Sequence, residues 1–100
     1  MQRLNSHQID LQLEKSQGWK KLLSSDGLES ISKNYKFDSY LEGIDFVNEV
    51  AQLAEKDNHH PDMLVKWCKV TVTLSTHDAQ GLTDKDFSLA RKIDLEMDSL

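Results

Sequence analysis

Residues 39–61 read SYLEGIDFVNEVAQLAEKDNHHP, and this stretch predicts the long helix against which the rest of the fold is built. Ser39 and Glu42 match the capping-box pattern S-x-x-E, in which two side chains satisfy free N–H groups at a helix start. With about 100° per residue, the polar side chains fall on one narrow stripe. This stripe contains Glu42, Asp45, Glu49, Gln52 and Lys56.

The apolar arc of this predicted helix is wider than one face of a sheet would cover. It contains Tyr40, Leu41, Ile44, Phe46, Val47, Val50, Ala51, Leu53 and Ala54. An apolar surface of that width predicts that part of the helix meets another subunit. Glu55 lies at the edge of the arc and not on the polar stripe, so we expect its carboxylate to have a specific partner.

On the N-terminal side, residues 19–37 predict a β-hairpin. The turn cluster Ser-Ser-Asp-Gly at 24–27 separates a short strand starting at Trp19 from a longer strand ending at Phe37. Further upstream, Ser6 is placed to cap a short helix that runs to about Lys15.

On the C-terminal side, residues 63–76 are rich in β-branched residues and alternate between apolar and polar. This pattern fits one long strand or two strands that turn near Trp67 and Cys68, and periodicity does not distinguish them. Thr83 and Asp86 then match a helix-start pattern, T-x-x-D. The helix phase puts Asp86 on the inward face, together with Ala90, Ile93 and Met97.

The order of elements predicts an α+β fold, with an antiparallel sheet and helices packed against it. A length of 100 residues predicts a single domain, 1–100. The 12 basic and 17 acidic residues give a net charge of −5, which argues against a nucleic-acid groove. No apolar run approaches the roughly 20 residues of a membrane span. Cys68 is the only cysteine, which indicates a reducing, cytoplasmic setting.

Three of the four histidines, His59, His60 and His77, frame the predicted C-terminal strand region. Imidazole has a reference pKa of about 6.5, so it can donate and accept protons near neutral pH. Adjacent residues in an extended segment point to opposite sides, which makes a metal chelate by both His59 and His60 awkward. Pro61 restricts His60 to an extended conformation.

The strand phase raises a question about the third histidine. Strict alternation puts His77 on the side of Thr71, Thr73 and Ser75, opposite the apolar row, whereas Asp86 faces the core. Either the strand ends before His77 or the two residues do not touch. Taken singly, each feature also has a structural explanation: the His-His-Pro triplet as the end of a helix, and Asp86 as a helix cap.

Their joint spacing resembles the pterin-4a-carbinolamine dehydratase family. The resemblance rests on Glu55, the His59-His60-Pro61 triplet, Trp67, Thr76-His77, and Gly81-Leu82-Thr83 with Asp86, and it extends from Gly18-Trp19 to Ile93. It implies a four-stranded antiparallel sheet with three helices packed on one face, assembled into dimers or tetramers. The implied reaction converts a 4a-hydroxytetrahydropterin to quinonoid dihydropterin and water without a cofactor or metal, and thereby restores the pterin spent by aromatic amino-acid hydroxylases.

The resemblance also implies roles for particular residues. His59, His60 and His77 would carry proton transfer and substrate contact, and Glu55 and Asp86 would orient them or bind the pterin. Residues expected to line the pocket are Asn58, Pro61, Ser75, Thr76 and Asp78, with Trp19 as an aromatic wall. The chain departs from the family at Asn58, where an acidic residue is common, and at Met63 and Ala79.

Two other interpretations compete with the enzyme. In animals the family also serves as a dimerisation cofactor of a transcription factor, so a protein-binding module is the first alternative. The second is a metal site formed by the three histidines and a carboxylate.

Overall fold

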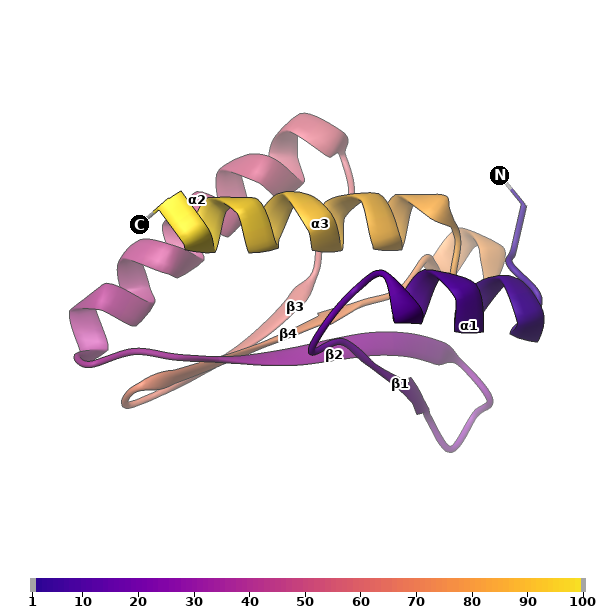
Figure 1. Ribbon diagram of the computed structural model, residues 1–100, viewed down its shortest axis with the longest axis horizontal. Helices are drawn as coiled ribbons and strands as arrows, with labels where there is room; N and C mark the ends of the chain where they lie inside the picture. The colour runs from indigo at the N-terminus through magenta and orange to yellow at the C-terminus, as the bar shows by residue number, and fades with distance from the viewer. Residues whose placement is uncertain (1, 100) are drawn as a thin grey trace.

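The computed structural model describes residues 2–99. Its helices are α1 (Ser6–Glu14), α2 (Tyr40–Asp57) and α3 (Asp84–Ser99), and a 3₁₀ turn, η1, spans His77–Ala79. Its strands are β1 (Lys20–Leu23), β2 (Glu29–Lys36), β3 (Asp62–Lys66) and β4 (Lys69–Leu74). The predicted α+β order, α-β-β-α-β-β-α, is confirmed (Figure 1).

The four strands form one antiparallel sheet in the order β1-β2-β4-β3. The predicted strand region 63–76 is therefore two strands, which turn at Trp67 and Cys68 and pair Val65 with Val70. Because β3 pairs only with β4, its other edge faces away from the sheet.

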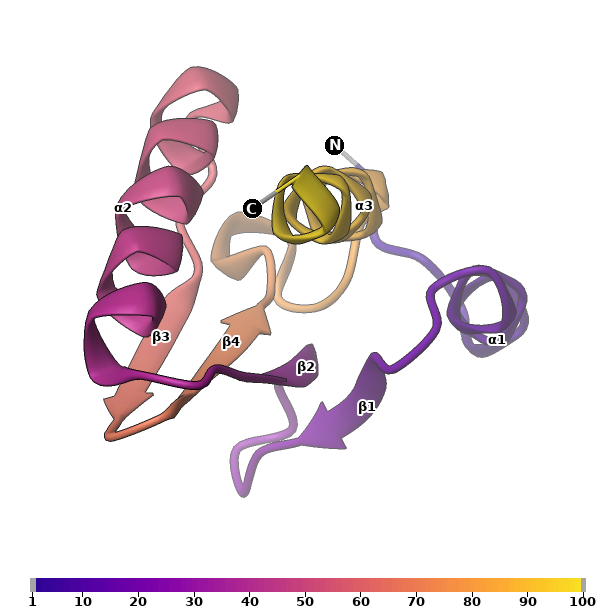
Figure 2. The same cartoon turned by 60° about the vertical axis from the view of Figure 1, so that its left-hand side comes forward.

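The two faces of the sheet differ because successive side chains point to opposite sides. Figures 1 and 2 show α2 and α3 over one face, with α1 beside them toward β1. On that face the strands bury Ile31, Tyr35, Val70, Val72 and Leu74, against Phe46 and Val50 of α2 and Phe87 and Ile93 of α3. The opposite face carries mostly polar side chains, together with the exposed Leu22 and Leu64.

Helix α2 is capped at its start by Ser39 and ends at Asn58. The Ser39 hydroxyl accepts a hydrogen bond from the Glu42 N–H at 3.2 Å, as predicted for the cap. At the other end Asn58 adopts a left-handed conformation with φ 48°, which asparagine tolerates better than most residues. The His59 N–H then reaches back to the Ala54 carbonyl at 3.0 Å. This tight ending delivers His59 and His60 directly after the helix.

The cap of α1 differs from the prediction. Asn5, and not Ser6, is the N-cap: its side chain accepts from the Gln8 N–H, and Gln8 accepts from the Asn5 N–H, both at 2.9 Å. A box starting at Ser6 would have needed Ile9 to reciprocate, which an apolar side chain cannot do.

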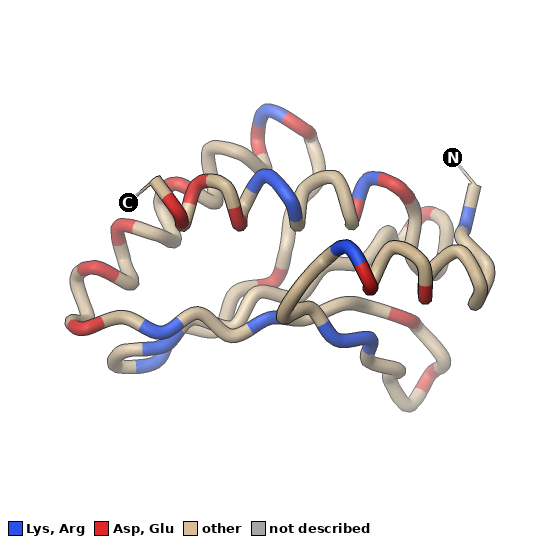
Figure 3. The backbone as a smooth tube through the Cα atoms, viewed as in Figure 1, with Lys and Arg blue, Asp and Glu red and all other residues tan. Residues whose placement is uncertain are grey.

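Charged residues are distributed unevenly over the elements. Acidic residues are spaced along α2 and are frequent on α3, whereas most of the charged residues on the strands are lysines (Figure 3). Within residues 2–99, no helix combines the length and the apolar character needed to cross a membrane.

Candidate active site

A pocket of about 200 Å³ lies at the end of the sheet where β4 finishes and β3 starts. Three short segments meet there: the turn between β1 and β2, the residues on either side of Pro61, and the end of β4. The lining residues are Ser24, Leu28, Ser30, His60, Asp62, Thr73, Ser75 and His77. Two of the three predicted catalytic histidines therefore share one pocket.

His60 is paired with the carboxylate that the helix phase singled out. Its Nε2 lies 2.5 Å from Oε2 of Glu55, five residues back in the last turn of α2. Because a carboxylate can only accept, the imidazole donates through its Nε2–H. In the neutral ring, Nδ1 then carries no proton and can accept a hydrogen bond. The predicted specific partner of Glu55 is thus found, and both side chains are exposed, at 56% for His60 and 77% for Glu55.

His59 points the other way, into the protein. Its Nε2 lies 2.6 Å from Oδ1 of Asp86, which is fully buried, as the helix phase predicted. The second Asp86 oxygen accepts from the Thr83 N–H at 2.9 Å and from the Thr76 hydroxyl at 2.8 Å. A hydroxyl has one hydrogen to donate, and that of Thr76 goes to Asp86. The Thr76 oxygen therefore accepts from the Thr83 hydroxyl, at 2.8 Å.

This network satisfies a buried carboxylate on both oxygens. A buried charge left without partners would cost several kcal/mol, so Asp86, His59 and Thr76 hold one another in place. His59 and His60 pair with different carboxylates on opposite sides of the chain, as expected for adjacent residues before Pro61. Within residues 2–99, no three His, Cys, Asp or Glu side chains are arranged to hold a metal ion.

The question raised by the phase of His77 is answered by the end of β4. The strand stops at Leu74, and the Thr76 N–H bonds to the Gly81 carbonyl at 2.9 Å across the loop that contains η1. His77 stays on the side of Thr73 and Ser75, so it faces the pocket, while the inward position next to Asp86 belongs to Thr76.

Ser75 contributes an unusual group to the pocket wall. Its hydroxyl oxygen is buried and has no hydrogen-bond partner among residues 2–99. Buried polar groups are nearly always hydrogen-bonded in proteins. Ser75 lines the same pocket as His60 and His77, so its hydroxyl would meet a polar ligand there once the side chain turns toward the pocket.

The structure does not bring every predicted site residue to this pocket. Trp19 lies in the core, with its ring 6.3 Å from that of Tyr35, and its indole N–H donates to Asp94 at 3.0 Å. The expectation of an aromatic wall from Trp19 is therefore corrected: its N–H is satisfied by α3, which holds the ring inside the core. Asn58, Pro61 and Asp78 lie next to the histidines in sequence but outside the pocket lining.

Other lining residues were not predicted. Thr73 could have been found, because it shares the strand phase of Ser75 and His77. Ser24, Leu28 and Ser30 come from the β1–β2 hairpin, and no local pattern indicates that this hairpin reaches the end of β4. The turn is held by hydrogen bonds from Ser24 and the Leu28 N–H to Asp26, which keep the pKa of that carboxyl below its usual value.

Comparison with known proteins gives a consistent result. The sequence profile of the family described as pterin 4 alpha carbinolamine dehydratase matches residues 2–95. A protein of Sinorhizobium medicae is 47% identical over 93 residues, covering 93% of this chain and 86% of its own. One from Picosynechococcus is 44% identical over 92 residues, covering 92% and 95%. Both carry provisional names as pterin-4-alpha-carbinolamine dehydratases.

Two solved structures are similar in fold. A Brucella melitensis protein described as a transcriptional coactivator/pterin dehydratase superposes with a TM-score of 0.85 at 34% identity, covering 93% of this chain and 96% of its own. A pterin dehydratase-like protein described as a RuBisCO assembly factor superposes at 0.66 with 22% identity, over 78% of this chain and 87% of its own. The second likeness concerns the fold alone.

Proposed function

This chain belongs to the pterin-4a-carbinolamine dehydratase family, and from that premise we propose that it dehydrates 4a-hydroxytetrahydropterins by histidine acid–base catalysis. The observation that carries the proposal is the pairing of His60 and His77 in the wall of one pocket. The product would be quinonoid dihydropterin, and the physiological role would be to recycle the pterin of an aromatic amino-acid hydroxylase.

The chemistry needs two proton transfers at neutral pH. One proton reaches the hydroxyl oxygen on C4a as the carbon–oxygen bond breaks, and another leaves N5, so the products are quinonoid dihydropterin and water. Imidazoles are suited to both tasks, and each positioned group contributes typically about 10²- to 10⁴-fold. His60 and His77 are placed to divide them, with Ser75 offering its free hydroxyl to the bound ring.

His59 takes part from behind the pocket in this proposal. Its hydrogen bond to the buried Asp86 holds the ring orientation and puts a proton on Nε2. Through Thr76 the same carboxylate also anchors the segment that carries Ser75 and His77. Glu55 orients His60 in the same manner at the surface.

We further propose that the 100-residue chain acts as one domain, in the cytoplasm, as a homodimer or homotetramer. Large apolar side chains remain exposed on two neighbouring elements: Leu41 at 70% on α2, and Leu64 at 57% and Trp67 at 79% on β3 and its turn. An unpaired edge strand can pair with another chain. A second copy that covers β3 and α2 would therefore pair the open edge of β3 and bury the exposed apolar side chains.

The test is direct. We would generate the 4a-hydroxypterin with a phenylalanine hydroxylase and follow its dehydration with and without this protein. We expect acceleration by the wild type, and a loss of about 100-fold or more in His60→Ala and His77→Ala. His7→Ala, a change at an exposed histidine of α1, serves as the matched control and should leave the rate unchanged.

A protein-binding module is the second candidate, and the exposed apolar residues of α2 and β3 favour it. If the wild type gave no acceleration while remaining folded, the enzyme proposal would fail and the binding role would lead. Metal analysis of the purified protein addresses the remaining alternative, since a stoichiometric zinc ion would contradict the acid–base proposal.

A further inference from the structure

Most carboxylates near the pocket of His60 and His77 are already bonded within the protein. Glu55 accepts from His60. Asp86 is fully buried, and both of its oxygens accept hydrogen bonds from the surrounding chain. Neither of these two carboxylates lines the pocket. Their task is to hold other residues in place, so a ligand would have to find an anionic partner elsewhere.

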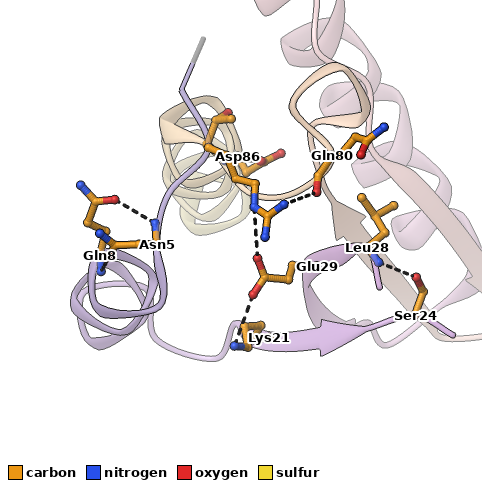
Figure 4. A network of polar contacts seen from close by, with 10 residues as sticks. Asn5, Gln8, Lys21, Ser24, Leu28, Glu29, Gln80 and Asp86 are labelled. Atoms are coloured by element: carbon orange, nitrogen blue, oxygen red, sulfur yellow. Dashed lines mark hydrogen bonds and ion pairs between the residues drawn. The ribbon is translucent and has the colours of Figure 1, made fainter. Parts of the chain in front are cut away.

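A third carboxylate, Asp26, is bonded within the turn between β1 and β2. It accepts from the Ser24 hydroxyl, and from the Leu28 N–H at 3.3 Å. The Ser24 oxygen also accepts from the Leu28 N–H, at 3.0 Å, and Figure 4 shows this contact within the turn. Because the single hydrogen of the Ser24 hydroxyl goes to Asp26, this serine has none to donate to a ligand. Asp26 therefore stabilises the wall of the pocket without being part of its lining.

Asp62 is the acidic residue that residues 2–99 contribute to the lining of this pocket. It is exposed at the first position of β3. Its carboxylate forms no hydrogen bond or ion pair with any other side chain among residues 2–99. Both of its oxygens can therefore accept hydrogen bonds from a ligand that carries donors.

The pairing of β3 with β4 fixes the place of this carboxylate in the pocket. Asp62 lies directly opposite Thr73, and side chains paired in this way share a face of the sheet, with Cβ atoms about 4.5–5.5 Å apart. Ser75 follows Thr73 by two residues on the same face, and His60 precedes Asp62 by two, or about 7 Å of extended chain. All of them line the pocket together with His77. The imidazoles therefore lie toward the end of the sheet, and the carboxylate lies one step back along the strands.

A carboxylate in this place suits a ligand with two adjacent donors. The 2-amino group and the N3–H of a pterin stand side by side on the pyrimidine edge of the ring, so the two oxygens of one carboxylate can accept from both. An imidazole offers only one acceptor nitrogen and a hydroxyl only one oxygen, so the other polar side chains of the pocket match this edge less well. The reacting atoms C4a and N5 lie away from the amino-bearing edge.

We propose that Asp62 binds the 2-amino and N3–H edge of the pterin, and that this contact turns the C4a–N5 side of the ring toward His60 and His77. The inference rests on the proposed function, because it requires a pterin ring in that pocket. Asp62 then selects rings that carry the amino group, while the histidines transfer the protons. Because Asp62 is exposed, water screens the contact in part, and its contribution to the affinity should be about tenfold.

The experiment uses a stable ligand and changes both partners of the contact. Calorimetry measures Kd of 7,8-dihydrobiopterin, and of its 2-dimethylamino analogue, for the wild type and for Asp62→Asn. Dihydrobiopterin should bind about tenfold more weakly to Asp62→Asn, because the amide has one acceptor oxygen and no charge. The analogue lacks the amino donors, so its Kd should differ by less than about twofold between the two proteins, since coupling requires both groups.

Kinetics and a matched control make the result specific. In Asp62→Asn, KM for the 4a-hydroxypterin should rise about tenfold while kcat changes by less than about threefold, as expected for a binding contact remote from the reacting atoms. Asp10→Asn removes the same charge from an exposed position of α1 and should change neither Kd nor the rate. An unchanged Kd in Asp62→Asn, or an equal loss for both ligands, would overturn the inference. A wild type that neither binds dihydrobiopterin nor accelerates dehydration would overturn the proposed function, and the inference with it.

Discussion

Helix α3 carries two aspartates, Asp86 and Asp94, which lie eight residues or about 12 Å apart along its axis. Each of them forms hydrogen bonds with three other residues. Asp86, at the N-terminal end, is fully buried and bonds His59, Thr76 and Thr83. Asp94, two turns on, is partly exposed and bonds the Trp19 N–H at 3.0 Å, the Lys33 ammonium at 2.8 Å and the Tyr35 hydroxyl at 2.5 Å.

The difference lies in what the partners can do with a proton. An indole, an ammonium group and a phenol all keep their protons at neutral pH. Burial, and then the hydrogen bond to Asp94, raise the pKa of Tyr35 further above its usual value. The Asp94 cluster therefore ties α3 to the sheet. At Asp86 one partner is an imidazole, and the carboxylate sets its orientation next to a pocket.

The largest effect is expected at Asp86. Asp86→Ala leaves His59, Thr76 and the Thr83 N–H without their acceptor inside the protein, which should cost about 3 kcal/mol of unfolding free energy. Dehydration should fall about 100-fold, because the histidine and the β4 end lose their anchor. Urea unfolding and initial rates corrected for the folded fraction would measure the two effects. Asp86→Asn keeps the shape, and a wild-type rate in that variant would reduce Asp86 to a structural role.

Asp94→Asn should lower the unfolding free energy and leave the dehydration rate nearly unchanged. It weakens three hydrogen bonds to a partly buried carboxylate, so we expect a loss of about 1–2 kcal/mol in the unfolding free energy. The dehydration rate of the folded protein should stay within about twofold, since the cluster lies two turns from the pocket. A rate loss as large as that of Asp86→Asn would remove the contrast between the two aspartates.

Alkaline titration sharpens the comparison through Tyr35. Its folded-state pKa is raised, so its contribution to stability is complete below about pH 10, where an unfolded tyrosine titrates, and decreases as the pH rises further. The decrease is at most about 1.4 kcal/mol per pH unit. Urea unfolding near pH 9 and pH 11 should show a steeper loss in wild type than in Tyr35→Phe. Equal slopes would indicate that the phenol is not shielded.

The smallest effect is expected at Lys33. This lysine donates to Asp94 and lies 5.1 Å above the Tyr35 ring, with its side chain 22% exposed. Lys33→Met keeps the packing of the stem and removes the charge, so the unfolding free energy should fall by less than about 1 kcal/mol. Chemical unfolding would measure this, with the dehydration rate as a check that the pocket is untouched. A loss above 2 kcal/mol would mean that the ion pair, and not the packing, holds the cluster.

Much of the site could be predicted because helix and strand periods are local properties. The helix phase indicated that Asp86 faces inward and that Glu55 has a partner, and the strand phase put His77 on the side of Ser75. The partner of Asp86 could not be predicted in this way. His59 is 27 residues away in sequence, and only the path of β3 and β4 brings it to α3.

Trp19 is a residue that was expected in the pocket and lies elsewhere. A family resemblance suggested it for the pocket, but its indole N–H had an unforeseen acceptor 75 residues away on α3. The hairpin residues Ser24 and Leu28 were missed for a related reason: where a turn reaches depends on how its strands twist and pair, which no local pattern records.

By itself, the sequence determined most of the elements and their inward faces, because these follow from side-chain type and from periods of 3.6 and two residues. It also nominated three histidines as candidates for the site. Tertiary structure decided which aspartate of α3 meets a histidine and which histidines share a pocket. These are long-range contacts between segments with no common period, so they exist only once the sheet has brought the segments together.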